Sequence, residues 1–149
     1  MITITNDMFA RPKYLEWVYM YFNKNTHNFG YIGRAKNSNR CAIRIMEHRS
    51  EEWCKDKDWT IAFCPCLNRT ESEMMETLCI NTYHPNVNKD KVGWGLLLGC
   101  HIPEVVDLPQ IKESERKPVA YIQSFLETYE REILSTIKDF KGGNNELNR

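Results

Sequence analysis

The chain has 149 residues, of which 42% are hydrophobic and 27% are charged. This length suits one domain with a core and is short for two, and the composition excludes a disordered or collagen-like chain. The formal net charge is zero, which by itself argues against a nucleic-acid-binding protein. Residues 11–49, however, contain eight basic residues against two acidic ones. This local excess of positive charge predicts a face suited to an anionic partner.

No N-terminal segment combines a basic start, an apolar stretch and a cleavage site, and the longest apolar run, residues 94–100, is too short to span a bilayer. We therefore expect a cytoplasmic protein with no membrane partner. The six cysteines form no CxxC pair and no Cys/His set at zinc-ligand spacing. Reduced and mostly buried thiols are the expected state, and a zinc site is the weaker alternative.

The first predicted element is a β-hairpin. Residues 16–22 (EWVYMYF) and 29–33 (FGYIG) are rich in aromatic and β-branched side chains, and residues 23–28 (NKNTHN) favour a turn. Residues 59–64 (WTIAFC) have the composition of a third strand. We expect Pro65 to end that strand, because proline cannot donate a backbone hydrogen bond.

Two helices are predicted around these strands. Residues 37–39 (NSN) supply capping side chains for a helix that reaches about His48. Residues 68–73 (NRTESE) form a capping region, in which Thr70 and Glu73 have the spacing of a capping box, and they predict a second helix up to about Tyr83.

The C-terminal part contains one strong signal. Residues 92–99, which are rich in glycine, fit either a loop or a short buried strand. Residues 118–140 carry apolar side chains at helical spacing and predict a long amphipathic helix. The two glycines at 142–143 are expected to end it.

Two tyrosines occupy matching places on the predicted hairpin strands, in residues 17–19 (WVY) and 30–33 (GYIG). On the helix that follows, His48 comes one turn after Arg44. Residues four apart lie on the same side of a helix, so these two side chains are neighbours. Taken singly, strand tyrosines are most often packing residues and a helical arginine is most often solvated.

A third piece lies in the second helix and the turn after it. Glu76 is followed nine residues later by Pro85 and twelve residues later by Asn88. Together with the hairpin and the first helix, this order of residues across 17–88 resembles the GIY-YIG nuclease domain. The second half-motif of that domain is intact here, and the first keeps only its tyrosine.

The resemblance implies an α+β fold in which residues 1–90 form a GIY-YIG-like domain, with a small three-stranded antiparallel sheet flanked by helices. Residues 91–149 would be an extension whose long amphipathic helix packs on the core or serves in dimerisation. The implied activity is that of a divalent-metal-dependent DNA endonuclease that hydrolyses phosphodiester bonds. The implied catalytic residues are Tyr19, Tyr31, Arg44, His48, Glu76 and Asn88.

Each of these residues has an expected role in phosphodiester hydrolysis. Glu76 would hold a single Mg²⁺ or Mn²⁺ ion, whose remaining ligands would be water and phosphate. Arg44, or alternatively Arg40, would bind a phosphate oxygen through its forked donors. Tyr19 or Tyr31 would position the attacking water or take its proton, and a nearby cation would have to favour the phenolate.

Which tyrosine acts as the base remains open at this stage. His48 would hydrogen-bond to a tyrosine or to water, and Asn88 would be a supporting residue. These are expectations from the resemblance, and they depend on whether the side chains converge in space.

The expected partner is DNA, and a homodimer is a further expectation because it would place two active sites together. Arg34, Lys36 and Arg40 would contact DNA phosphates without reading bases. An alternative function is a nucleic-acid-binding module that has kept the fold and lost activity, since the first half-motif is altered. The sequence does not separate restriction, repair or recombination, and mobile-element roles.

Overall fold

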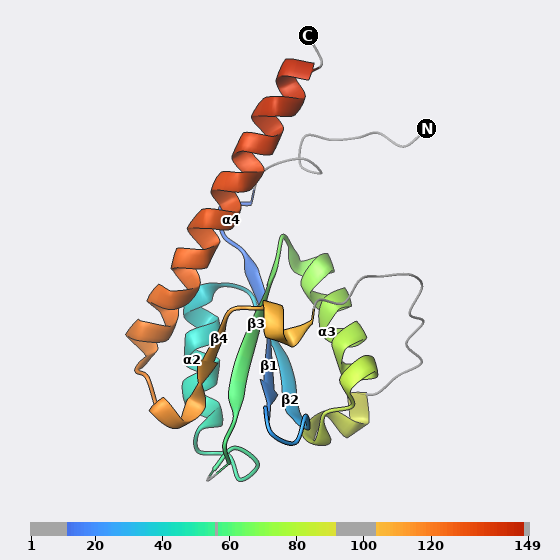
Figure 1. Ribbon diagram of the computed structural model, residues 1–149, viewed down its shortest axis with the longest axis vertical. Coiled ribbons are helices and arrows are strands. Elements are labelled where there is room, and N and C mark those ends of the chain that lie inside the picture. The colour runs from blue at the N-terminus through green and yellow to red at the C-terminus, as the bar shows by residue number, and fades with distance from the viewer. Residues whose placement is uncertain (1–11, 56, 92–103, 148–149) are drawn as a thin grey trace.

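The computed structural model describes residues 12–55, 57–91 and 104–147. In these ranges the protein has an α+β fold, as predicted, with a four-stranded antiparallel sheet and three α-helices (Figure 1). The strands are β1 (Glu16–Phe22), β2 (Phe29–Ala35), β3 (Thr60–Cys66) and β4 (Gln110–Lys112), and the helices are α2 (Ser38–His48), α3 (Arg69–Tyr83) and α4 (Val119–Leu147).

The order of strands in the sheet is β2-β1-β3-β4. The three predicted strands are present, and the sheet has a fourth one that the sequence analysis did not predict. β4 has three residues, of which only Ile111 is buried, so it is too short to show a periodic pattern. Because β4 pairs with β3, the C-terminal part of the chain contributes to the same sheet as the hairpin.

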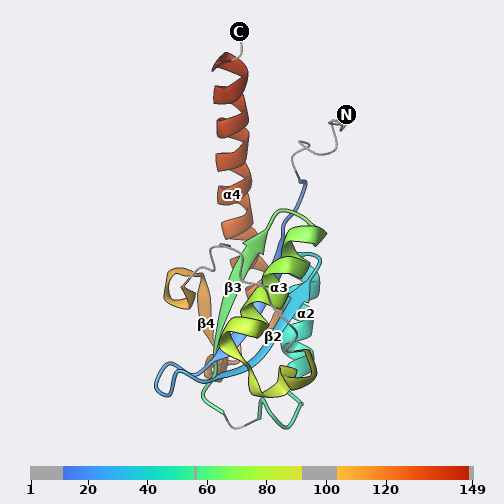
Figure 2. The same ribbon diagram turned by 90° about the vertical axis from the view of Figure 1, so that its right-hand side faces the viewer.

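The sheet has a buried side chain layer on each face because successive strand residues point in opposite directions. Trp17, Tyr19 and Tyr21 of β1 point to the face covered by α2 and α4, whereas Val18 and Met20 point to the face covered by α3. All five side chains are buried. Figures 1 and 2 show these helices on the two sides of the sheet. β1 is therefore a central strand in a three-layer arrangement.

The prediction that Pro65 ends the third strand is wrong, since β3 continues to Cys66. The N–H of Phe63 donates to the carbonyl of Pro109 at 2.9 Å, so alternate residues of β3 direct their nitrogens toward the side of β4. β4 pairs only with residues 60–62. The nitrogen of Pro65 thus points beyond the end of β4, where the described part of the chain supplies no ladder partner and proline is tolerated.

The predicted capping region of α3 is confirmed, but the Thr70–Glu73 capping box within it is wrong. The helix begins at Arg69, and its N-cap is Asn68, whose side-chain oxygen accepts a hydrogen bond from the N–H of Glu71 at 2.9 Å. This amide lies two residues before the N–H of Glu73 that Thr70 would bind in the predicted pair. At α2 the prediction is confirmed, because the N-cap is an asparagine at 37, within the predicted capping stretch.

Helix α4 begins where it was predicted and continues past residues 142–143 to Leu147. Glycine in a helix costs about 1 kcal/mol relative to alanine. Two glycines therefore weaken this part of the helix without having to end it. Near its start, α4 packs against α2 and buries Ile122 and Leu126 completely. Its N-terminal half therefore belongs to the core.

Two broader expectations also bear on the described residues. The five described cysteines are free and buried thiols, as predicted. No helix in the described ranges is both long enough and apolar enough to cross a membrane. Residues 92–99, for which the sequence left a loop or a strand open, lie outside the described residues.

Candidate functional site

Three of the predicted catalytic residues form a compact cluster between the sheet and α2. The Tyr19 hydroxyl lies 3.0 Å from Nε2 of His48. The ring centroids of Tyr31 and His48 are 4.6 Å apart, and those of Tyr19 and Tyr31 are 6.0 Å apart with nearly parallel planes. We call Tyr19, Tyr31 and His48 the tyrosine–histidine cluster.

The sheet order explains why the two tyrosines differ in exposure. Tyr19 is in the central strand β1 and its side chain is 1% exposed, whereas Tyr31 is in the edge strand β2 and is half-buried. His48, in the last turn of α2, is also 1% exposed. Tyr31 is therefore the one tyrosine of this cluster that solvent reaches.

The electrostatics of the cluster favour neutral side chains. Burial raises the pKa of Tyr19 well above its usual range, and the neighbouring Tyr31 adds to this, while the guanidinium of Arg44 opposes it. Burial lowers the pKa of His48 below its ordinary value of about 6.5. At neutral pH the Tyr19 hydroxyl is therefore protonated and the imidazole of His48 is uncharged, so the hydroxyl can donate to Nε2.

Gly33, the last residue of the intact half-motif, makes room for the Tyr19 phenol. Gly33 pairs with Tyr19 across the hairpin. A Cβ atom at position 33 would lie 2.5 Å from both Cζ and the hydroxyl oxygen of Tyr19, and 2.8 Å from the ring of Tyr31. These distances are too short for real contacts. The absence of a side chain at position 33 therefore allows the two tyrosine rings to pack directly against the backbone of the strand.

We expect Gly33→Ala to lower the free energy of unfolding by about 1–3 kcal/mol, because the added methyl group overpacks a rigid site. Urea denaturation measures this change. Gly30→Ala is the matched control, since its methyl group would lie 2.5 Å from the ring of Trp59 instead. Both variants should be destabilised, and only Gly33→Ala should disturb the Tyr19–His48 contact. Equal stability of Gly33→Ala and the wild type would contradict this packing.

Asn88 is a structural support of the edge strand. Its side-chain oxygen accepts a hydrogen bond from the N–H of Ile32 at 2.8 Å, and its amide nitrogen donates to the carbonyl of the same residue at 3.0 Å. Asn88 is 3% exposed, so these bonds are shielded from water. Ile32 immediately follows Tyr31, and Asn88 therefore fixes the strand that carries the solvent-facing tyrosine.

Glu76 lies on α3, which covers the opposite face of the sheet from α2, and its side chain is half-buried. On the same helix, Glu73 reaches Arg34 at 3.6 Å and Tyr83 stacks on Phe29 with ring centroids 4.1 Å apart. Both partners are in β2, so α3 follows this edge strand and Glu76 lies between the two contacts. The structure thus brings Glu76 alongside β2 and does not place it within the tyrosine–histidine cluster.

A divalent metal ion is implied by the resemblance, and the available donor set can be compared with it. Within the described ranges, no group of three or more His, Cys, Asp or Glu residues is placed to hold a metal ion. Mg²⁺ does not require such a group, since it commonly binds through one or two carboxylates and completes its shell with water and substrate phosphate. The single hard oxygen ligand offered by Glu76 fits an ion of this kind.

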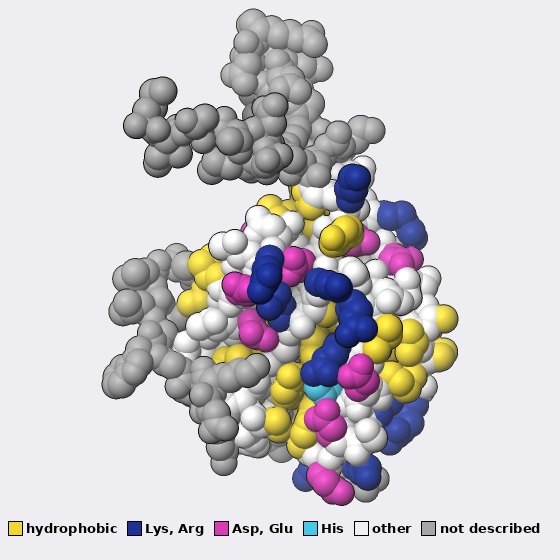
Figure 3. Space-filling model, turned by 180° about the vertical axis from the view of Figure 1, so that it is seen from behind, with side chains coloured by type: hydrophobic (Ala, Val, Ile, Leu, Met, Phe, Trp, Pro, Cys, Tyr) yellow, Lys and Arg dark blue, Asp and Glu magenta, His cyan; other side chains and the backbone are white. Residues whose placement is uncertain are grey.

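A groove of about 600 Å³ lies next to the cluster and is strongly cationic. Figure 3 shows Lys and Arg side chains gathered in a band across this face. We call it the cationic groove, and its lining residues are Tyr14, Glu16, Arg34, Ala35, Lys36, Arg40, Arg44 and Arg69. All three predicted phosphate contacts, at 34, 36 and 40, line it. Arg69 was not predicted, because it lies far away in sequence at the start of α3.

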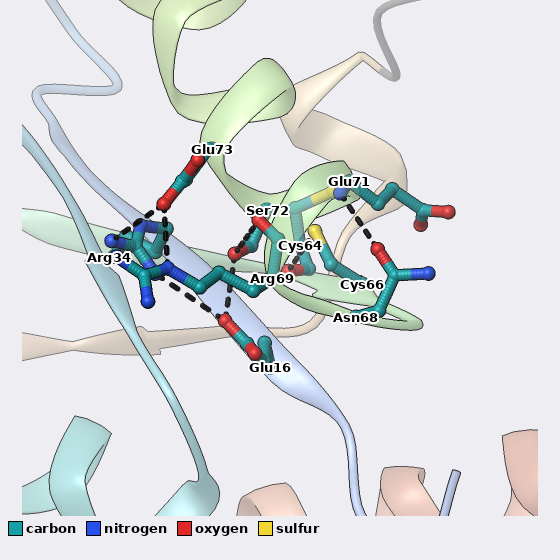
Figure 4. Close-up of polar contacts among 9 residues, drawn as sticks. All are labelled: Glu16, Arg34, Cys64, Cys66, Asn68, Arg69, Glu71, Ser72 and Glu73. Atoms are coloured by element: carbon teal, nitrogen blue, oxygen red, sulfur yellow. Dashed lines mark hydrogen bonds and ion pairs between the residues drawn. The ribbon is translucent and has the colours of Figure 1, made fainter. Parts of the chain in front are cut away.

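Two of these cations are held by acidic neighbours (Figure 4). Arg34 contacts Glu16 at 3.4 Å and Glu73 at 3.6 Å, and Arg69 donates to Glu73 at 2.7 Å. The hydroxyl of Ser72 also donates to Glu16 at 2.8 Å. This network orients the Arg34 guanidinium in the groove and neutralises part of its charge. Arg44 is likewise paired, with Glu47 at 2.8 Å, so Lys36 and Arg40 carry most of the free positive charge of the groove lining.

Arg44 connects the cationic groove to the tyrosine–histidine cluster. Its guanidinium lines the groove, interacts electrostatically with the buried Tyr19 hydroxyl and donates to Glu47 at 2.8 Å. Arg40 lines the same groove one turn earlier, and its backbone N–H is bound by the Asn37 cap. Of the two candidate arginines, the contact with Tyr19 therefore distinguishes Arg44.

A scan against protein-family models, a search of curated proteins and a search of solved structures found no match for this chain. The function is therefore inferred from the residues and geometry described above.

Proposed function

We propose that this protein is a divalent-metal-dependent DNA endonuclease of the GIY-YIG type. The observation that carries the proposal is the position of Arg44, which belongs both to a cationic groove and to a cluster of two tyrosines and a histidine. A groove lined by several cations suits a polyanionic backbone. A phenol and a guanidinium beside it are groups that can position water and stabilise charge on a phosphate in the transition state.

In this proposal Tyr31 is the tyrosine that acts on water. Its half-buried side chain is open to solvent, whereas Tyr19 is buried and its hydroxyl is engaged by His48. The Tyr31 phenolate would accept a hydrogen bond from the attacking water and take up its proton as the new bond to phosphorus forms and the bond to the leaving oxygen breaks. Nearby positive charge would have to favour the phenolate, and the guanidinium of Arg44, which interacts electrostatically with Tyr31, is a source of that charge.

Arg44 acts as the phosphate clamp. Its planar fork of donors matches two phosphate oxygens, which a lysine cannot do. Tyr19 and His48 form a buried support behind it, because the Tyr19 hydroxyl donates to His48 and leaves its oxygen lone pairs for the guanidinium. Glu76 would hold the metal ion, which supplies positive charge for the leaving oxygen when bound.

The principal test is cleavage of DNA. Plasmid and branched DNA incubated with the full chain should be cut in the presence of Mg²⁺ or Mn²⁺ and left intact with EDTA. A protein that binds both DNAs and cuts neither with either metal would overturn the proposed activity and favour the inactive binding module. Cleavage that is equally fast in EDTA would overturn the metal dependence.

The cationic groove can be tested separately through binding. We expect Arg40→Ala to weaken binding to all DNA sequences alike and to reduce the slope of log K against log salt by about 1, since one phosphate contact is lost. Fluorescence anisotropy at several salt concentrations measures this slope. Lys112→Ala is the control, because Lys112 is an exposed cation of β4 outside the groove lining. Equal losses for both variants would contradict binding in the groove.

A further inference from the structure

Glu51, in the turn after α2, is tied to His48 by two hydrogen bonds. Its carboxylate oxygen Oε1 lies 3.0 Å from Nδ1 of His48, and its backbone N–H donates to the His48 carbonyl at 2.9 Å. The second oxygen, Oε2, accepts a short hydrogen bond from the indole N–H of Trp53. Both carboxylate oxygens therefore have a partner, and the carboxylate is fixed relative to the imidazole.

Trp53 closes this turn over the tyrosine–histidine cluster. Its ring stacks on Tyr31 with centroids 5.2 Å apart and an interplanar angle of 18°, and it meets Tyr21 edge-on at 4.9 Å. The ring centroid of Trp53 also lies 5.3 Å from that of His48. The imidazole is thus enclosed by aromatic rings, and its two nitrogens are left with defined partners.

These partners determine the tautomer of His48. A carboxylate only accepts hydrogen bonds, so the proton of the neutral imidazole must be on Nδ1, facing Glu51. Nε2 is then a lone-pair acceptor, and the Tyr19 hydroxyl must donate to it. The opposite tautomer would set a lone pair of Nδ1 against the carboxylate, and it would make the Tyr19 hydroxyl the acceptor of the Nε2–H.

We propose that Glu51 is a positioning residue that holds His48 in the Nδ1–H tautomer, so that Tyr19 donates to His48 and presents its oxygen to Arg44. This rests on the proposed function, in which Arg44 binds the scissile phosphate. The chain of contacts runs from Trp53 through Glu51, His48 and Tyr19 to Arg44 in the cationic groove. The same logic applies wherever a carboxylate orients a histidine through one ring nitrogen so that the other can act.

The charges around His48 give the expected direction of its titration. Burial lowers the pKa of His48 and Arg44 lowers it further, whereas Glu51 and Glu47 raise it. Partial burial of Glu51 acts to raise the pKa of its carboxyl group, but hydrogen bonds from Trp53 and His48 outweigh this and lower that pKa. The carboxylate is therefore charged at neutral pH. Removing that charge should lower the pKa of His48, and the imidazolium should then form only at a more acidic pH.

The test compares Glu51→Ala and Glu51→Gln with the wild type. Long-range ¹H–¹⁵N spectra, with His48 assigned by its loss in His48→Gln, report the tautomer and its pKa. The wild type should show Nδ1–H. Glu51→Ala should give a mixture of tautomers, and Glu51→Gln should retain Nδ1–H, because an amide oxygen still accepts, while lowering the pKa of His48. The control is Glu52→Gln, since the Glu52 side chain is 94% exposed and should change neither property.

Cleavage kinetics supply the second readout. Glu51→Ala should lower kcat by about tenfold to a hundredfold with little change in DNA affinity, and Glu51→Gln should recover most of that loss. A wild-type His48 in the Nε2–H form, or a kcat for Glu51→Ala equal to that of the wild type, would overturn the proposal. If the wild type cuts no DNA, the proposed function fails, and the tautomer measurement still decides whether Glu51 positions His48.

Discussion

Replacing Tyr31 with phenylalanine is expected to lower the rate of DNA cleavage by about a hundredfold to ten-thousandfold and to leave the free energy of unfolding nearly unchanged. Phenylalanine keeps the stacking with Trp53 and loses only the hydroxyl of this half-buried side chain. Single-turnover cleavage with saturating protein measures the rate, and urea denaturation measures the stability. DNA affinity should also be retained, because the phosphate contacts are made by the groove.

The matched variant is Tyr19→Phe, for which we expect the larger effect on the free energy of unfolding and the smaller effect on the cleavage rate. Without the hydroxyl, Nε2 of His48 loses its partner at a site where both side chains are 1% exposed. An unsatisfied buried polar atom costs about 1–3 kcal/mol, so Tyr19→Phe should be clearly less stable than Tyr31→Phe. If Tyr19→Phe keeps full stability and abolishes cleavage while Tyr31→Phe cuts normally, the assignment of the base must be reversed.

The difference between the two tyrosines shows what could not be read from the sequence. The alternation of aromatic residues in β1 and β2 predicts a hairpin, and the half-motifs mark Tyr19 and Tyr31 equally. Their exposure depends on which strand lies in the middle of the sheet, and this follows from the pairing of β1 with β3, which is remote in sequence. Long-range pairing of this kind leaves no local pattern.

Only part of the cationic groove could be predicted from the sequence. Arg34, Lys36 and Arg40 follow one another where β2 leads into α2, so their proximity in space reflects their proximity in sequence. Arg69 reaches the groove only because α3 packs beside β2, and nothing in its local sequence indicates this.

The position of Glu51 in the sequence fits a contact with His48 but does not single this residue out. It stands three residues after His48, a spacing at which helical side chains meet, and the contact between them follows that rule. The charged stretch in which it lies contains other acidic residues with equal claim, such as Glu47 and Glu52. Only the fold of the turn, with Trp53 closing over the cluster, selects Glu51.

The second large effect is expected from Glu76→Gln, which should lower the cleavage rate by about a thousandfold, or ~4 kcal/mol, without weakening DNA binding. The change removes one negative charge and keeps the size of the side chain. Because a neutral amide binds Mg²⁺ more weakly than a carboxylate does, the metal concentration required for half-maximal cleavage should also rise. Cleavage rates measured over a range of Mg²⁺ concentrations report both quantities.

The position of Glu76 makes this variant the sharpest test of the metal. Glu76 is on α3, across the sheet from α2, so its effect on cleavage cannot be attributed to the packing of Tyr19 against His48. Glu71→Gln is the control on the same helix, since glutamine can still accept the hydrogen bond from the Leu67 N–H. If Glu76→Gln cuts DNA as fast as Glu71→Gln at every Mg²⁺ concentration, the metal is not held by Glu76. The tyrosine–histidine cluster and Arg44 would then have to act with a metal bound elsewhere or with none.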